Sequence, residues 1–183
     1  VASGLEYRTD VSHFRLATHL LTALFLLAAL VWTARDFALM ARDPSAPKAR
    51  LTRPAVAVVA ILFVQLLLGA WVAGLNAGYV ASTWPSMNDH FVPEGIDWSR
   101  GAWFAFTNDP FLIHFLHRWW SWAAALAMLL LARALLRRGA RTEPALLVAV
   151  VAAQMTLGIL TVVTGVSMWI AVLHQVTGAV LVA

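Results

Sequence analysis

The chain has 183 residues, of which 61% are hydrophobic and 12% are charged, and its mean hydropathy is +0.77. Several apolar runs are long enough to cross a bilayer, which needs roughly 20 such residues, so a soluble domain is excluded. The net charge of +4 does not indicate a nucleic-acid partner, because the basic residues gather in two short loops beside apolar runs.

Five membrane spans are expected, joined by loops of different charge. The spans cover about 14–34, 54–80, 111–136, 144–164 and 169–183. The loop after the first span and the loop after the third are basic. Their basic residues are Arg35, Arg42, Lys48, Arg50 and Arg53, then Arg133, Arg137, Arg138 and Arg141. The positive-inside rule therefore predicts that both loops are cytoplasmic and that the acidic, Trp-rich connection 81–110 is external.

The chain begins at Val1, and its fifth apolar run is only about 15 residues long, shorter than the roughly 20 residues of a full span. We therefore expect a fragment of a longer membrane protein. The chain contains no cysteine, which excludes disulfides, thiolate zinc sites and iron–sulfur clusters. A metal would need His, Met or carboxylate ligands.

Three histidines lie inside spans that all run inward from the external side: His19, His117 and His174. At 1.5 Å rise per residue each lies roughly 6 to 10 Å below its helix start, so the three should be level. A single such histidine can simply be a neutral imidazole bonded to a neighbouring helix. Three at one depth favour haem, with His117 and His174 as its two axial ligands. His19 is left without a partner in this chain.

Other polar and aromatic residues near these positions have plainer interpretations. Arg118 can either neutralise a haem propionate or contact a lipid headgroup. His114 can either contact a haem propionate or be solvated, and we expect solvation; His13 and His90 are expected to be ordinary surface residues. Trp119, Trp120 and Trp122 are expected in an interfacial aromatic belt, with direct packing on a haem as the alternative. No span contains Asp or Glu, so the chain offers no obvious catalytic base.

A short pattern occurs twice along the chain. Gln65-Leu-Leu-Leu-Gly69 in the second span matches Gln154-Met-Thr-Leu-Gly158 in the fourth. His19 with Thr22 and His174 with Thr177 also share one offset. The pattern is either the trace of an internal repeat or a chance match. The glycines themselves predict close helix packing.

Several motifs together resemble the haem A synthase family, of the alphaproteobacterial or mitochondrial type. In chain order they are Val11-Ser-His-Phe-Arg-Leu-Ala-Thr-His19-Leu, Leu68-Gly-Ala-Trp-Val-Ala-Gly-Leu-Asn-Ala-Gly78, Trp84-Pro-Ser-Met87, His117-Arg118 and Leu173-His174-Gln175. The resemblance covers nearly the whole chain. Its order and spacing make it specific, although each motif alone is weak.

The resemblance implies an all-α, polytopic membrane bundle of eight spans arranged as two similar four-helix bundles. This chain would correspond to spans four to eight, half of that duplicated architecture plus one helix of the other half. Residues 1–53 would supply the last helix of the N-terminal, substrate-haem bundle and a cytoplasmic linker. Residues 54–183 would form the C-terminal haem b bundle, truncated in its last helix.

The family oxidises a methyl group of haem O to a formyl group, which gives haem A for terminal oxidases. By resemblance, His117 and His174 would hold a haem b that relays electrons, His19 would bind the substrate haem O, and all three would be iron ligands. The family's catalytic Glu would lie outside this chain, so the chain alone should be inactive.

The resemblance also implies surroundings and partners. It predicts a multi-pass protein of the bacterial inner membrane with its haem sites toward the external face. The partners implied are haem O and haem A, haem O synthase, cytochrome c oxidase assembly factors, membrane lipid and a second copy of the chain. Two alternatives stay open: a b-type cytochrome subunit that only transfers electrons, and a haem-free assembly or transport protein.

Overall fold

The computed structural model describes residues 11–46, 50 and 52–183, and within them every regular element is helical. The long helices are α1 (His13–Arg42), α2 (Arg53–Gly74), α4 (Pro110–Arg137) and α5 (Thr142–Val163). The shorter elements are the 3-10 helix η1 (Ala77–Tyr79), α3 (Ala102–Asn108) and α6 (Met168–Val182). The predicted all-α fold is confirmed.

Four helices, α1, α2, α4 and α5, are long and apolar enough to cross a membrane. The fifth predicted span is the apolar but shorter α6, with 15 residues. Large apolar side chains cover the outside of these helices; on α1, for example, Phe25 is 70% exposed and Leu30 is 68% exposed. Such surfaces suit lipid, and helices satisfy their own backbone polar groups there. The chain is a multi-pass membrane protein.

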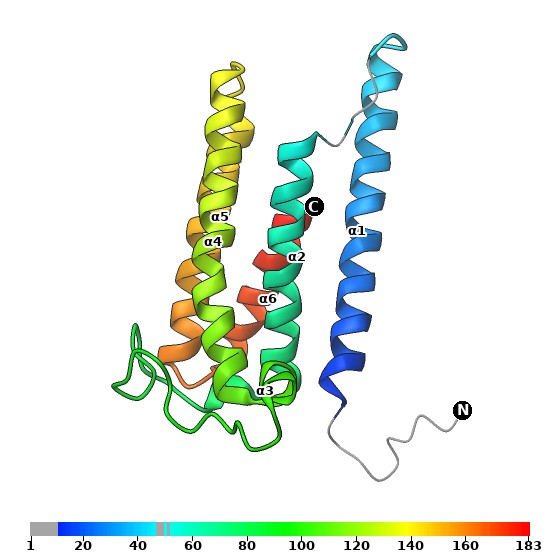
Figure 1. The fold of residues 1–183 in the computed structure, drawn as a ribbon. Coiled ribbons are helices and arrows are strands. Elements are labelled where there is room, and N and C mark those ends of the chain that lie inside the picture. The colour runs from blue at the N-terminus through cyan, green and yellow to red at the C-terminus, as the bar shows by residue number, and fades with distance from the viewer. Residues whose placement is uncertain (1–10, 47–49, 51) are drawn as a thin grey trace, which may run out of the picture.

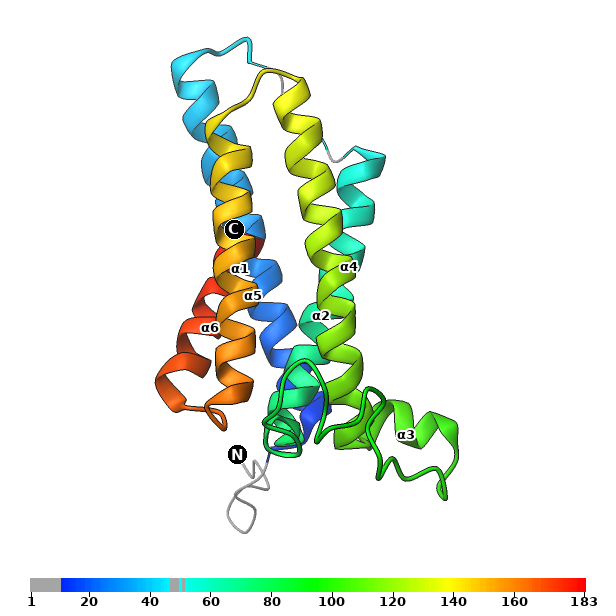
Figure 2. The same cartoon turned by 90° about the vertical axis from the view of Figure 1, so that its left-hand side faces the viewer.

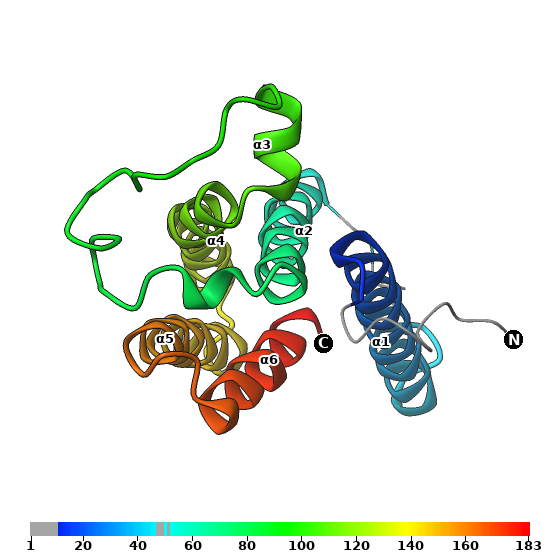
Figure 3. The same ribbon diagram turned by 90° about the horizontal axis from the view of Figure 1, so that it is seen from below.

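The helices α2, α4, α5 and α6 surround a common centre, and α1 stands beside them (Figure 3). α1 packs mainly along α2 and also touches α6. α1, α4 and α6 begin at the same end of the molecule, whereas α2 and α5 run the other way (Figure 1). The predicted common direction of the three histidine-bearing helices is therefore confirmed.

Each candidate histidine lies six or seven residues after the start of its helix: His19 in α1, His117 in α4 and His174 in α6. The long connection between η1 and α4, with α3, gathers at the end where these helices begin (Figure 2). The histidines thus lie in the part of the bundle nearest this connection.

Two element boundaries differ from the sequence prediction. The second span was expected to reach residue 80, but α2 ends at Gly74. Asn76 follows in the left-handed conformation, with φ of 53°, a region that asparagine tolerates better than most residues, and the chain then turns into η1. The connection 81–110 was expected to be a loop, yet it contains α3. The division at residues 53 and 54 stays a prediction, and Lys48 lies outside the described residues.

The start of α4 is fixed by Asp109, which is 6% exposed. Its side chain accepts a hydrogen bond from the backbone N–H of Leu112 at 2.8 Å and another from the N–H of Asp97 at 3.0 Å. The first bond caps the helix, because the opening N–H groups of a helix have no partner within it. The second ties the connection 81–110 to α4, so Asp109 helps to set the register of the helix that carries His117.

His13 was expected at the surface, and that prediction is wrong. It is only 9% exposed, and its Nε2 donates to the backbone carbonyl of Thr107 in α3 at 2.8 Å. Gly74 explains the burial, since a Cβ there would lie 2.6 Å from the Cα of His13. The missing side chain lets the first turn of α1 pack against the end of α2, where His13 lies edge-on to Trp71.

Candidate functional site

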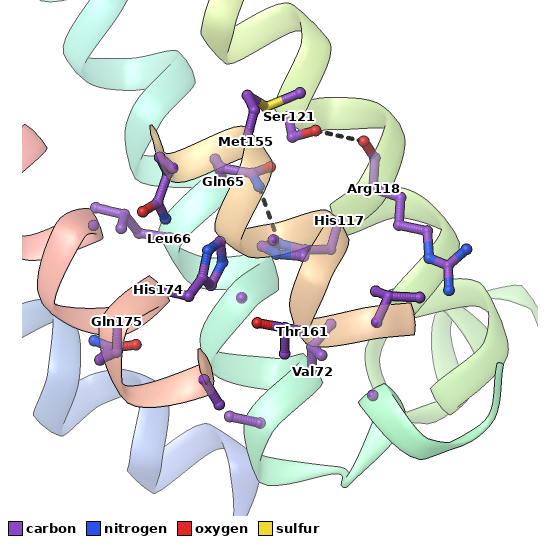
Figure 4. Close-up of a pocket in the computed structure, with 18 of the residues that line it drawn as sticks. Gln65, Leu66, Val72, His117, Arg118, Ser121, Met155, Thr161, His174 and Gln175 are labelled. Carbon is purple, nitrogen blue, oxygen red and sulfur yellow. Dashed lines mark hydrogen bonds between the residues drawn. The ribbon is translucent and has the colours of Figure 1, made fainter. Parts of the chain in front are cut away.

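A cavity of about 420 Å³ lies between α2, α4, α5 and α6. Most of its lining is apolar, and the two histidines His117 and His174 are among its few polar groups. Figure 4 shows both rings directed into the same space from α4 and α6. Apolar lining with a few convergent polar groups is typical of a cofactor or ligand site.

The His117 ring packs directly on the backbone of α2. A Cβ placed on Gly69 would lie 3.0 Å from Cε1 of His117 and 3.5 Å from its Nδ1. The amide nitrogen of Gln65, one turn earlier on α2, lies 3.2 Å from the same Nδ1. Gly69 therefore provides the space that the ring occupies, and Gln65 provides the polar group beside it (Figure 4).

The His174 ring packs on α5 in the same way. A Cβ on Gly158 would lie 3.0 Å from Cε1 of His174 and 3.6 Å from its Nδ1. Gln154 again precedes the glycine by four residues. The two Gln-x-x-x-Gly segments noticed in the sequence thus take equivalent places, each facing a histidine on the antiparallel neighbour. One difference is that Nδ1 of His174 is buried without a hydrogen-bond partner.

The donor set suits haem better than a bare metal ion. Among the described residues, no group of three or more His, Cys, Asp or Glu side chains could hold a metal ion. A protein-bound zinc ion usually takes three or four such ligands, whereas haem brings its own ring nitrogens and needs only axial ligands from the protein. Two imidazoles in an apolar cavity, each seated on a glycine, fit that requirement.

Arg118 is held in place by backbone carbonyls of the connection 81–110. It is 5% exposed, and its guanidinium donates to the carbonyls of Ala81 at 2.9 Å, Thr83 at 2.8 Å and Ser86 at 3.1 Å. Its Nε also donates to Nε2 of His114 at 3.1 Å. These bonds use four of the five N–H groups of Arg118, so its partners are protein groups and not a lipid headgroup. A contact with a propionate would have to use the one remaining N–H.

His114 was expected to be solvated, and that prediction is wrong. The residue is 2% exposed, and it is covered because Arg118 draws the chain around residues 81–86 over it. His90, in contrast, lies at the surface as expected, with Nδ1 3.3 Å from Oε1 of Glu94. Trp119 lies against Phe91, with ring centroids 4.8 Å apart.

His19 lies apart from the cavity. It is exposed and shares a shallow depression with Phe14, Arg15, Thr18 and Thr22. At 3.6 residues per turn it projects about 200° around the helix from Ala17, which is buried. The structure therefore brings His117 and His174 together and leaves His19 on a separate face of α1.

Comparison with known proteins identifies the family of this chain. The family described as "Cytochrome oxidase assembly protein" matches residues 1–183. The chain belongs to this family. The chain is also similar to proteins named "Heme A synthase". The one from Sphingopyxis alaskensis is 80% identical over 183 residues, which are 100% of this chain and 52% of that protein.

Two further relatives carry the same name. The protein of Erythrobacter litoralis is 55% identical over 100% of this chain and 54% of its own length. That of Rhodopseudomonas palustris is 41% identical over 96% of this chain and 48% of its own length. The chain thus spans about half the length of the curated relatives it matches. No solved structure matches it.

The sequence prediction missed that Gly69, Gly158, Gln65 and Gln154 lie at the same site as the two imidazoles. The glycines were read as general packing positions, and the glutamines had no assigned role. The available signal was the repeated Gln-x-x-x-Gly spacing on the helix antiparallel to each histidine-bearing helix. What the sequence did not reveal is that each glycine faces an imidazole.

Proposed function

We propose that the complete protein is a haem A synthase, which oxidises a methyl group of haem O to the formyl group of haem A. The observation that carries this proposal is the pair of imidazoles in one glycine-lined apolar cavity of a family member. The names of its relatives support the reaction and the substrate. The proposed enzyme is an integral membrane oxidoreductase.

We further propose that His117 and His174 would hold a resident haem b through their imidazole rings. A haem held by two imidazoles supplies reversible electron transfer. The chain's own residues hold and shield it: the glycines admit the rings, and the apolar lining of α2, α4, α5 and α6 excludes water. Arg118 fixes the segment at residues 81–86 over the cavity and keeps one N–H for a propionate.

His19 we assign to a different site, which binds the substrate haem O. Its exposed position outside the cavity supports a separate site, and its companion groups would come from helices outside this chain. Haem O synthase would deliver the substrate, and oxidase assembly factors would receive haem A. A second copy of the protein is a further proposed partner.

The test of the function is conversion of haem O by the complete protein and by its His19→Ala variant. We expect the wild-type protein to produce haem A. We expect His19→Ala to lower production at least about 10-fold, because an iron ligand is lost, while most haem b stays bound by His117 and His174.

Haem content and haem O conversion must therefore be measured on the same samples. A wild-type protein that carries haem b and never converts haem O would be an electron-relaying cytochrome instead. A His19→Ala protein that loses haem b and keeps converting haem O would reverse our division of the two sites.

We propose the bacterial inner membrane as the location, with the cavity toward the external face. The basic residues at and after the C-terminal ends of α1 and α4 support a cytoplasmic position for these two ends. Because the chain has no cysteine, single cysteines can be added at Ser99 and Ser45. An impermeant thiol reagent applied to sealed cells should label Ser99→Cys and spare Ser45→Cys. The opposite pattern would place the cavity at the inner face.

A further inference from the structure

Several buried polar atoms around the two histidines have no hydrogen-bond partner. Among the described residues they include Oε1 of Gln65, Oε1 of Gln154 and Nδ1 of His174. Buried polar atoms in native proteins are nearly always paired, so an unpaired group calls for an explanation. Here the unpaired atoms are complementary, since two are acceptors and one is a ring nitrogen that can carry a proton.

The tautomer of an iron-bound imidazole accounts for these atoms. A ring that offers the lone pair of Nε2 to a metal carries its proton on Nδ1, and that N–H needs an acceptor. The amide nitrogen of Gln65, 3.2 Å from Nδ1 of His117, is a donor and cannot accept. A half-turn of the amide exchanges its nitrogen and oxygen at almost no change in shape. It would place Oε1 beside Nδ1 and satisfy both atoms.

Gln154 is positioned to do the same for His174. It lies one turn before Gly158, on which the His174 ring packs. A Cβ placed on Gly178 of α6 would lie 3.2 Å from the amide nitrogen of Gln154. Gly178 comes one turn after His174, so the two residues lie on the same face of α6. The amide and the ring therefore lie in the same interface between α5 and α6.

We propose that Gln65 and Gln154 are positioning residues that accept hydrogen bonds from Nδ1–H of His117 and His174, so that each ring presents Nε2 to the haem. This inference rests on the proposed haem b site. The bonds fix the ring planes and make each imidazole a stronger electron donor, as outer partners of ligating histidines do. A stronger donor favours the ferric state, so the two amides lower the midpoint potential of the haem.

The experiment compares Gln65→Leu, Gln154→Leu and Gln65→Glu in the purified complete protein. Each leucine keeps the side chain's bulk and removes the acceptor, whereas glutamate keeps an acceptor oxygen. Gln175→Leu is the matched control, because Gln175 adjoins His174 and lines the same cavity (Figure 4), but it is exposed and makes no hydrogen bond with either ring among the described residues. The readouts are haem b per protein, midpoint potential and the low-spin electron paramagnetic resonance spectrum.

We expect each leucine variant to lower haem b retention about 10-fold in detergent, to raise the midpoint potential of the haem that stays, and to shift the low-spin signal. Gln65→Glu should retain haem and have a potential at or below that of the wild type. Gln175→Leu should match the wild type. A role in packing alone would not order the potentials by acceptor strength.

The outcome that overturns the inference is specific. If the leucine variants keep wild-type haem content, potential and resonance signal, the glutamines do not position the rings. If the leucine variants do not fold, Gln65→Glu decides through its potential, which must not lie above that of the wild type. Failure of the proposed site itself looks different, because His117→Ala would then keep the wild-type haem spectrum.

Discussion

Replacing either His117 or His174 by alanine is expected to remove haem b from the complete protein. Both rings enter one apolar cavity, and no group of three or more His, Cys, Asp or Glu side chains among the described residues could hold a metal ion. His114 also lines this cavity, but its Nε2 accepts a hydrogen bond from Arg118. Losing one axial ligand should therefore lower bound haem b at least about 10-fold. The measurement is the reduced-minus-oxidised absorption spectrum of purified protein, normalised to protein content.

His90→Ala is the matched control, since His90 lies at the surface and contacts only Glu94 among the described ion pairs. It should keep the wild-type spectrum. A normal b-type spectrum in His117→Ala or in His174→Ala would show that the haem is held elsewhere. That result would remove the proposed cofactor site.

The second large effect is expected from alanine at Gly69 or Gly158. The added Cβ would lie 3.0 Å from Cε1 of His117 or His174, which is tighter than nine in ten Cβ contacts, so the ring must shift by a few tenths of an ångström. Alanine also stabilises a helix by about 1 kcal/mol relative to glycine, so the helix itself is not weakened. We expect haem b content to fall about 10-fold while helical content by circular dichroism stays unchanged.

A control of equal crowding is available at Gly78. Its added Cβ would lie 3.0 Å from Cγ2 of Val166, which is not one of the two rings. Gly78→Ala should retain most of the haem. Gly78 and Val166 also line the cavity. Equal losses in Gly69→Ala, Gly158→Ala and Gly78→Ala would therefore mean that crowding anywhere around the cavity expels haem, and that Gly69 and Gly158 have no special relation to the histidines.

The helices and their direction could be predicted from the sequence because apolar run length and loop charge report directly on membrane spans. The pairing of His117 with His174 followed from this, since two helices that start on one side bring residues of equal depth together. The ends of the helices were harder to predict from the sequence. The end of α2 at Gly74 depends on the left-handed conformation of Asn76, which hydropathy does not register.

Burial of polar residues near the helix starts could not be predicted for a different reason. His13 and His114 are buried because the connection 81–110 folds over them, through the carbonyl of Thr107 in one case and through Arg118 in the other. These contacts join residues far apart in the chain. Sequence periodicity describes one helix at a time, so it carries no information about which loop covers which side chain.

The proposed roles of Gln65 and Gln154 could be predicted from the sequence only in part. Their repeated spacing to glycine was visible in the sequence, but an amide in an apolar helix has many possible partners. Only the packing of α2 on α4 and of α5 on α6 connects each amide–glycine pair with a particular imidazole.

The most direct test of the haem site is a cryo-electron microscopy map of the complete protein purified with its bound haem. Our account predicts density for a flat macrocycle in the cavity between α2, α4, α5 and α6, with its iron between Nε2 of His117 and Nε2 of His174. It would be contradicted by a map in which lipid or side chains fill that cavity, or in which the iron is bound by any other pair of residues.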